Sequence, residues 1–295
     1  MCKLKSAIIL KDRIFMPDYD SHSKMLKELK ITDDYFNASK VFVRAELVPK
    51  NEDIFSDIDG WKLCVDQDIT PEWFDEKDCA ERMRKAVKEW ANTHIFIGQN
   101  GLKISHGENI LIKDCENVDI CDNATVKNIC GNATVKSICC NATVESICGN
   151  ATVESICGNA TVEGIYDNAT VEYICGNATV EGICGDATVK SICGSATVKY
   201  IYDNATVKNI YDNATVKCIC GNVTVKSICG NATVKSICGN ATVKCICGDA
   251  TVISFRYTKW NNSESLIISD NATFKDCYSG TIYQAGGWKL VEVKK

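Results

Sequence analysis

A nine-residue phrase repeated fifteen times in succession from Cys121 onward constrains the fold more than any other feature. Its consensus is Cys-Gly-Asn-Ala-Thr-Val-Lys-Ser-Ile, and three copies begin with Tyr-Asp in place of Cys-Gly. Gly, Asn and Asp tolerate left-handed backbone angles and favour turns, whereas Thr, Val and Ile favour strands. Each copy therefore predicts one turn and one short strand.

One turn reverses the chain without returning it to its start, so two copies are needed to close a coil. We expect a mainly β protein with a β-solenoid, a parallel β-helix or roll of about 18 residues per coil. Coils stacked about 4.8 Å apart would give a rod of about 35 to 40 Å from the repeats. A three-sided coil of 27 residues is the alternative.

Variation among the copies indicates which side chains face inward. The valine is the same in all fifteen copies, alanine changes once to Val223, and the final isoleucine changes once to Phe255. We expect these three positions to form the core. The residue after the valine is Lys or Glu in fourteen copies, and the residue before the isoleucine varies, so both belong on the solvent side.

The chain before the repeats predicts a small α+β domain. One helix begins near Ser21 or Ser23, and a longer one begins near Asp75, because these residues can cap the helices that follow them. Alternating apolar residues predict strands over 41–48 and 61–65. The expected domains are the α+β domain at 1–105, an N-terminal capping coil at 106–120, the solenoid at 121–254 and a C-terminal cap at 255–295.

No run of 18 apolar residues exists, and the N-terminal "AIIL" is too short for a signal peptide, so we expect a cytoplasmic protein without a membrane segment. In a reducing cytosol the twenty cysteines are free thiols, and the Asn-Ala-Thr sequons are a by-product of the repeat. An 18-residue coil stacks Cys139, Cys157 and Cys175, within range for disulfides if they are oxidised.

We expect no cofactor and no metal site. Calcium-binding nonapeptides carry Gly-Gly-x-Gly-x-Asp, whereas only a minority of these turns contain Asp. The sequence Cys-Ile-Cys occurs at 218–220 and at 245–247, without zinc-finger spacing or a nearby histidine. A dedicated zinc site is therefore not expected there, although soft metals could bind adventitiously. Ice binding is also disfavoured, because ice-binding surfaces usually pair threonines on each strand. Here each strand has a single threonine beside a charged residue.

The charged position after the valine is the candidate binding surface, because its signs come in blocks. A partner of complementary charge could dock there, although tandem duplication copying the local charge is a simpler explanation. Two lysines, Lys127 and Lys136, precede the blocks. The candidate residues are Glu145, Glu154, Glu163, Glu172, Glu181, Lys190, Lys199, Lys208, Lys217, Lys226, Lys235 and Lys244.

Catalytic residues are not evident. The three histidines all precede the repeats. Asp66 and Asp68 are expected on the same side of a predicted strand, and Asp18 and Asp20 fall in a predicted loop. Paired carboxylates can serve as acid and base, but without a third member they are more often solvated charges.

The segment "FVRAELVPKNEDIFSDIDGWKLCVDQDITPEWF" followed by Gly/Asp-Asn-Ala-Thr-Val nonapeptides resembles a group of uncharacterised β-solenoid proteins from gut bacteria and their phages. The match spans nearly the whole chain, and "VDQDITPEW" and the repeat phrase are its specific parts. The resemblance implies a microbial or viral origin and adds no catalytic residue.

These observations favour a non-enzymatic scaffold that presents a rigid surface to a protein partner, as a phage or mobile-element accessory or anti-host factor. Mimicry of nucleic acid is disfavoured because nine lysines against five glutamates follow the valines, whereas a mimic should be acidic along its length. Binding of nucleic acid is disfavoured because the basic block lacks interleaved arginines and aromatics. Two alternatives stay open. The first domain could be a small hydrolase-like enzyme with the solenoid as its substrate-binding or structural arm, or the rods could assemble into filaments.

Overall fold

The computed structural model describes residues 5–254, 267–277, 281–286 and 289–294. The chain divides into two compact units, Met1–Ile95 and Phe96–Lys295. This division falls before residue 105, where the sequence placed the end of the first domain. Residues 96–104 lack the repeat consensus, yet their strands pair with those of the solenoid, so packing rather than sequence similarity sets the boundary.

The first unit is built on an antiparallel sheet with strand order β2-β1-β3-β4. The run "AIIL", to which the sequence reasoning assigned no structure, lies in β1, and every residue of that strand is buried. The strands predicted over 41–48 and 61–65 are confirmed to within one residue. The strands are β1 (Lys5–Leu10), β2 (Ile14–Phe15), β3 (Phe42–Val48) and β4 (Lys62–Val65).

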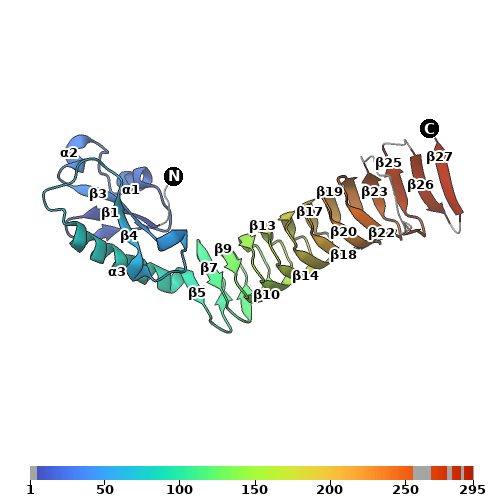
Figure 1. Cartoon of the computed structure of the whole chain (residues 1–295), viewed down its shortest axis with the longest axis horizontal. Coiled ribbons are helices and arrows are strands. Elements are labelled where there is room, and N and C mark those ends of the chain that lie inside the picture. The colour runs from blue at the N-terminus through green and yellow to red at the C-terminus, as the bar shows by residue number, and fades with distance from the viewer. Residues whose placement is uncertain (1–4, 255–266, 278–280, 287–288, 295) are drawn as a thin grey trace. The chain divides into compact units, whose positions relative to one another are not determined.

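Helices cover both faces of this sheet (Figure 1). Helix α3 (Glu76–His94) packs Met83 and Val87 against one face, while α1 (His22–Glu28) packs Met25 against the other. The predicted caps are confirmed, since Ser21 and Asp75 accept hydrogen bonds from backbone N–H groups of the first helical turns. The remaining short helices are α2 (Tyr35–Ala38), η1 (Lys50–Glu52) and η2 (Ile58–Gly60).

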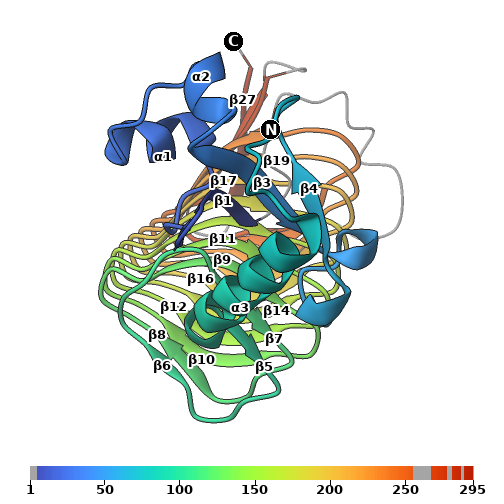
Figure 2. The ribbon, with the colours of Figure 1, turned by 90° about the vertical axis from the view of Figure 1, so that its left-hand side faces the viewer.

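The second unit is a β-solenoid, as predicted, in which successive strands alternate between two sheets (Figures 1 and 2). The even sheet contains β6 (Lys103–Ile104), β8 (Val118–Ile120), β10 (Thr134–Ile138), β12 (Thr152–Ile156), β14 (Thr170–Ile174), β16 (Thr188–Ile192), β18 (Thr206–Ile210), β20 (Thr224–Ile228), β22 (Thr242–Ile246) and β24 (Ile267–Ile268). The odd sheet contains β5 (Ile95–Ile97), β7 (Ile110–Lys113), β9 (Thr125–Cys130), β11 (Thr143–Ile147), β13 (Thr161–Ile165), β15 (Thr179–Ile183), β17 (Thr197–Ile201), β19 (Thr215–Ile219), β21 (Thr233–Ile237), β23 (Thr251–Ser254), β25 (Thr273–Asp276), β26 (Thr281–Gly286) and β27 (Lys289–Lys294).

The strand register settles the number of residues per coil. Thr143 pairs with Thr161 in parallel, one coil later, and this step of 18 residues recurs along both sheets. A 27-residue coil would instead pair Thr143 with Thr170. The ladder also continues through the corners between strands, where Asn150 donates its backbone N–H to the carbonyl of Gly131 at 2.9 Å.

The core consists of the three predicted positions. Each described alanine, valine and isoleucine at these positions is at most 5% exposed, and Val223 takes the place of alanine without leaving the core. Phe255, in the place of the last isoleucine, lies outside the described residues. The residue before the isoleucine is half-buried in most copies rather than fully exposed, because the corner side chain of the next coil, twenty residues later, lies close to it.

The C-terminal segment continues and then ends the parallel ladder. Residues 269–277, "SDNATFKDC", are a degenerate copy of the repeat, and within them β25 pairs in parallel with β23 and buries Phe274. Strands β26 and β27 then add antiparallel neighbours at that end of the odd sheet. These strands lie within the predicted cap at 255–295, and the irregular segment "YTKWNNSES" of that cap lies outside the described residues.

Candidate functional site

The structure separates the charge ladder into two columns on the two sheets, because consecutive repeats alternate between them. On both sheets the column changes from glutamate to lysine partway along the solenoid. The even column contains Lys136, Glu154, Glu172, Lys190, Lys208, Lys226 and Lys244, and the odd column contains Lys127, Glu145, Glu163, Glu181, Lys199, Lys217 and Lys235. The blocks seen in the sequence therefore become an acidic belt around the solenoid, followed by a lysine column on each sheet.

Ion pairs join the two blocks where the sign changes. Lys190 pairs with Glu172 on the even sheet, and Lys199 pairs with Glu181 on the odd sheet, each across one coil. Beyond these pairs, each lysine follows another lysine one coil earlier, at the strand spacing of about 4.8 Å. Repulsion between such neighbours is screened by water and salt, and it makes the columns suited to an acidic partner.

An exposed tyrosine lies beside each ion pair. Tyr173 follows Glu172 on the even sheet, and Tyr200 follows Lys199 on the odd sheet. The two side chains are 46% and 53% exposed, at a position where serine is the commonest residue. Sequence reasoning noted the variation there but did not see that it places one aromatic ring at the charge boundary of each sheet.

Asparagine ladders line the corners. The Asn141 side-chain amide donates to the side-chain oxygen of Asn123 at 3.4 Å, and Asn159 donates in turn to Asn141. The opposite corner has the same arrangement from Asn132 to Asn168. These amides hydrogen-bond to one another across the coils, which leaves the threonine and charged columns as the main outward-facing polar groups of the sheets.

The corner cysteines stack as predicted. Cys157 and Cys175 donate their backbone N–H groups to Ile138 and Ile156, one coil earlier. All the described cysteines are free thiols. Burial raises the pKa of most of the corner thiols whose pKa departs from its ordinary value, including Cys175, Cys220 and Cys229. Cys148 is an exception, because a hydrogen bond from the Cys130 thiol lowers its pKa to about 7.

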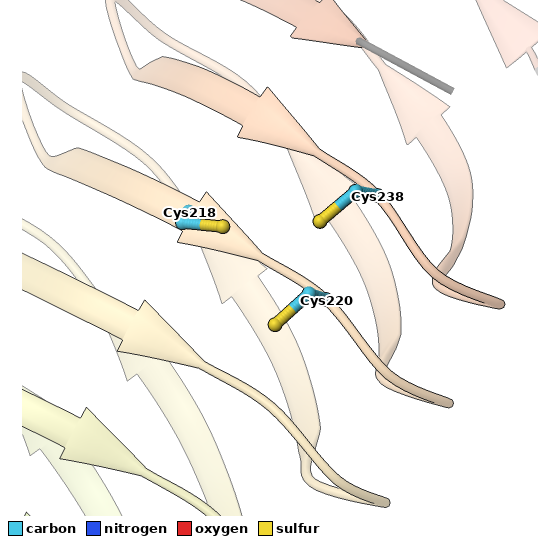
Figure 3. Close-up of side chains that lie close together, drawn as sticks. All are labelled: Cys218, Cys220 and Cys238. Atoms are coloured by element: carbon cyan, nitrogen blue, oxygen red, sulfur yellow. The ribbon is translucent and has the colours of Figure 1, made fainter.

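At one corner three thiols come together (Figure 3). The sulfur atoms of Cys218, Cys220 and Cys238 all lie within 4.8 Å of one another, and each residue is half-buried. Sequence reasoning considered only the Cys-Ile-Cys pair and missed Cys238. The 18-residue coil was the available signal, since it places Cys238 directly after Cys220 in the corner column.

The carboxylates considered for catalysis make separate contacts in the first unit. Asp66 lies 3.2 Å from Nδ1 of His22, whose Nε2 faces the Ala45 carbonyl at 3.2 Å. Asp18 pairs with His94 at 3.2 Å, and Asp20 accepts the backbone N–H of Ser6 at 3.1 Å. Asp68 is exposed. These contacts tie the first strand and α1 to the rest of the sheet, and they bring no pair of these carboxylates to a shared centre.

A depression on the outer side of α3 holds none of these carboxylates. Its volume is about 410 Å³, and most of its lining residues are charged side chains of that helix. Acidic and basic side chains both line it, so it does not present charge of one sign. Its lining residues are Asp59, Glu81, Arg84, Lys85, Lys88, Glu89 and Asn92.

Comparison with known proteins adds no functional assignment: no protein-family model, no curated protein and no solved structure matches the chain. Within the described residues, none of the helices has the length and apolar character required to span a membrane.

Proposed function

We propose that this protein is a non-enzymatic scaffold whose even sheet binds a protein partner with an acidic surface. The single observation that supports this best is the conjunction at Tyr173. An exposed aromatic ring lies beside the Glu172–Lys190 ion pair, and the lysine column continues from there along the sheet. Tyrosine and charged side chains in a rigid register are typical of the centre and rim of protein interfaces.

The even sheet is the better candidate of the two because its basic run is longer. Four lysines, from Lys190 to Lys244, continue its column, against three from Lys199 to Lys235 on the odd sheet. A parallel ladder fixes their spacing, so little backbone conformational freedom is lost when a partner binds. The resemblance to repeat proteins of gut bacteria and their phages favours a host protein as that partner.

The test compares two faces of the same chain. The full chain is immobilised, and its binding to poly-glutamate, to duplex DNA and to host lysate proteins is measured. We expect Tyr173→Ser combined with Lys208→Glu and Lys226→Glu to weaken binding of poly-glutamate and of the captured protein by about tenfold or more. Tyr200→Ser with Lys217→Glu and Lys235→Glu, the matched change on the odd sheet, should have a smaller effect.

Serine is the consensus residue at both tyrosine positions, so the tyrosine changes should leave the coil intact. Equal losses of binding affinity in the even-sheet and odd-sheet variants would contradict a docking surface on the even sheet. Tighter binding of DNA than of poly-glutamate would contradict an acidic protein as the partner class.

A further inference from the structure

Three cysteine side chains converge at one corner of the solenoid without a disulfide between them. Cys218 is the last residue but one of β19, Cys220 follows that strand directly, and Cys238 follows β21 one coil later. Figure 3 shows the sulfur atoms of Cys220 and Cys238 one above the other, with that of Cys218 beside them. All three sulfur atoms lie within 4.8 Å of one another.

This spacing fits one metal ion. A metal–thiolate bond is about 2.3 Å long, so three sulfurs around an ion in their plane would be about 4.0 Å apart. Closing the observed cluster to that size requires only small rotations of side chains. The backbone is already held, since Cys220 and Cys238 donate their N–H groups to Ile201 and Ile219 at 2.9 and 2.8 Å.

The donor set selects a soft ion. All three donors are sulfur, and thiolates favour Cu(I) and other soft ions over ions that prefer oxygen. A structural zinc site takes four protein ligands, whereas in the described part of the chain no fourth Cys, His, Asp or Glu joins this group. We propose that Cys218, Cys220 and Cys238 form a three-thiolate site for Cu(I). On binding, three S–H bonds break, three S–Cu bonds form, the protons pass to water, and copper keeps its oxidation state.

The site depends on a rare residue at one position of the repeat. The residue before the isoleucine is cysteine only at Cys218 and Cys245. Cys238 lies twenty residues after Cys218. Cys245 instead pairs with Ile267 in the next coil, so the position that corresponds to Cys238 is Ser269, which carries no thiol. Among the repeats the structure describes, three thiols therefore meet at this corner alone, and Cys245 provides a matched control.

The experiment uses the full chain, reduced without added thiols and kept free of oxygen. It is titrated with Cu(I) against a competing chelator, so that only the tightest site fills. One equivalent should be retained, and alkylation followed by mass spectrometry should find Cys218, Cys220 and Cys238 protected. This measurement needs no mutation. Protection spread evenly over the stacked cysteines, or displacement of the retained ion by an equal amount of Zn(II), would overturn the proposal.

Variants then test the ligands one by one. Cys218→Ser and Cys238→Ser should each lower the Cu(I) affinity by about 100-fold or more, since losing even a group that only orients a metal ligand costs 10- to 100-fold. Cys245→Ser should keep the wild-type affinity. Cu(I) should raise the melting temperature of wild type and of Cys245→Ser, but not of Cys218→Ser. Equal copper affinity in Cys218→Ser and Cys245→Ser would refute the assignment.

Discussion

The valine of each repeat lies at the centre of a thin interior that only small or branched side chains can fill. Within one repeat the buried positions are alanine, valine two residues later and isoleucine three residues after that. A regular strand would alternate every two residues, so the chain departs from strict alternation between valine and isoleucine. This departure lets the last apolar side chain face inward just before the corner.

A charge in this interior would have no partner. We expect Val180→Asp to lower the free energy of unfolding by about 3 to 5 kcal/mol, because Val180 is fully buried and its neighbours one coil away are also valines. Chemical denaturation followed by circular dichroism measures the loss. Thr179→Asp is the control, since this residue is partly exposed and should change stability far less. Equal losses from the two variants would place Val180 outside the core.

Thiol reactivity should vary between half-buried corner cysteines. The Cys130 thiol donates to Cys148 and lowers its pKa from about 9 to about 7, whereas burial raises the pKa of Cys229. The thiolate of Cys148 therefore accumulates as pH rises through about 7. At pH 7 iodoacetamide should modify Cys148 at least about fivefold faster than Cys229, after allowing for the lower nucleophilicity of a less basic thiolate.

The matched variants separate this hydrogen bond from simple access. Cys130→Ala removes the donor and should slow alkylation of Cys148, while Cys130→Ser keeps a donor and should preserve much of the rate. Peptide mapping over a pH series gives both rates. No change in the Cys148 rate in Cys130→Ala would show that the hydrogen bond does not control its reactivity.

At the scale of the coil, a corner can carry either cysteine or tyrosine because the neighbouring strand position can carry a small residue. Tyr166 lies over Gly164, and a Cβ atom added to that glycine would come within 2.0 Å of the tyrosine ring. At Gly182 an added Cβ would be 3.7 Å from its nearest neighbours, which is an ordinary contact. A tyrosine is far larger than a cysteine and needs open space beside it, and a glycine provides that space for Tyr166.

This pair of glycines gives a matched test. Gly164→Ala should lower the free energy of unfolding by about 1 kcal/mol, at the small end of overpacking effects because the ring can turn toward solvent. Gly182→Ala should be close to neutral. Adding Tyr166→Cys to Gly164→Ala should recover most of the loss, since cysteine is the consensus corner residue. Thermal unfolding of the wild type, Gly164→Ala, Tyr166→Cys and the double variant would measure this coupling, and purely additive effects would contradict the proposed contact.

The coil itself could be predicted from sequence because local propensity and the period of nine agree. The core positions could also be predicted from the sequence, because the valine and isoleucine hardly vary among the copies. The thiol cluster was missed because only cysteines close together in the sequence were considered, whereas Cys238 lies twenty residues after Cys218 and becomes its neighbour through the 18-residue coil. The start of the solenoid was also missed, since β5 and β6 join the ladder through backbone pairing without the repeat residues.

At the scale of the whole solenoid, the open ends of the parallel ladders need protection. A terminal strand presents unpaired N–H and C=O groups that can pair with another chain. At the C-terminal end β24 covers β22, β25 covers β23, and two antiparallel strands follow on the odd sheet. The antiparallel direction ends the coil, because a strand that runs backwards cannot begin another turn of the same solenoid.

Removing this cap should therefore turn the solenoid into a self-associating molecule. A chain truncated after Ser254 exposes the edges of β22 and β23, and we expect its mass by light scattering to rise with concentration while the full chain keeps a constant mass. In the truncated chain, Ile253→Lys restores the lysine that most repeats carry at this outward position and should suppress association, because charge on an edge strand opposes pairing. A β-sheet spectrum for each protein checks that the coils persist. Equal masses for the full and truncated chains would mean that the final strands do not act as a cap, and association insensitive to Ile253→Lys would place the contact away from this edge.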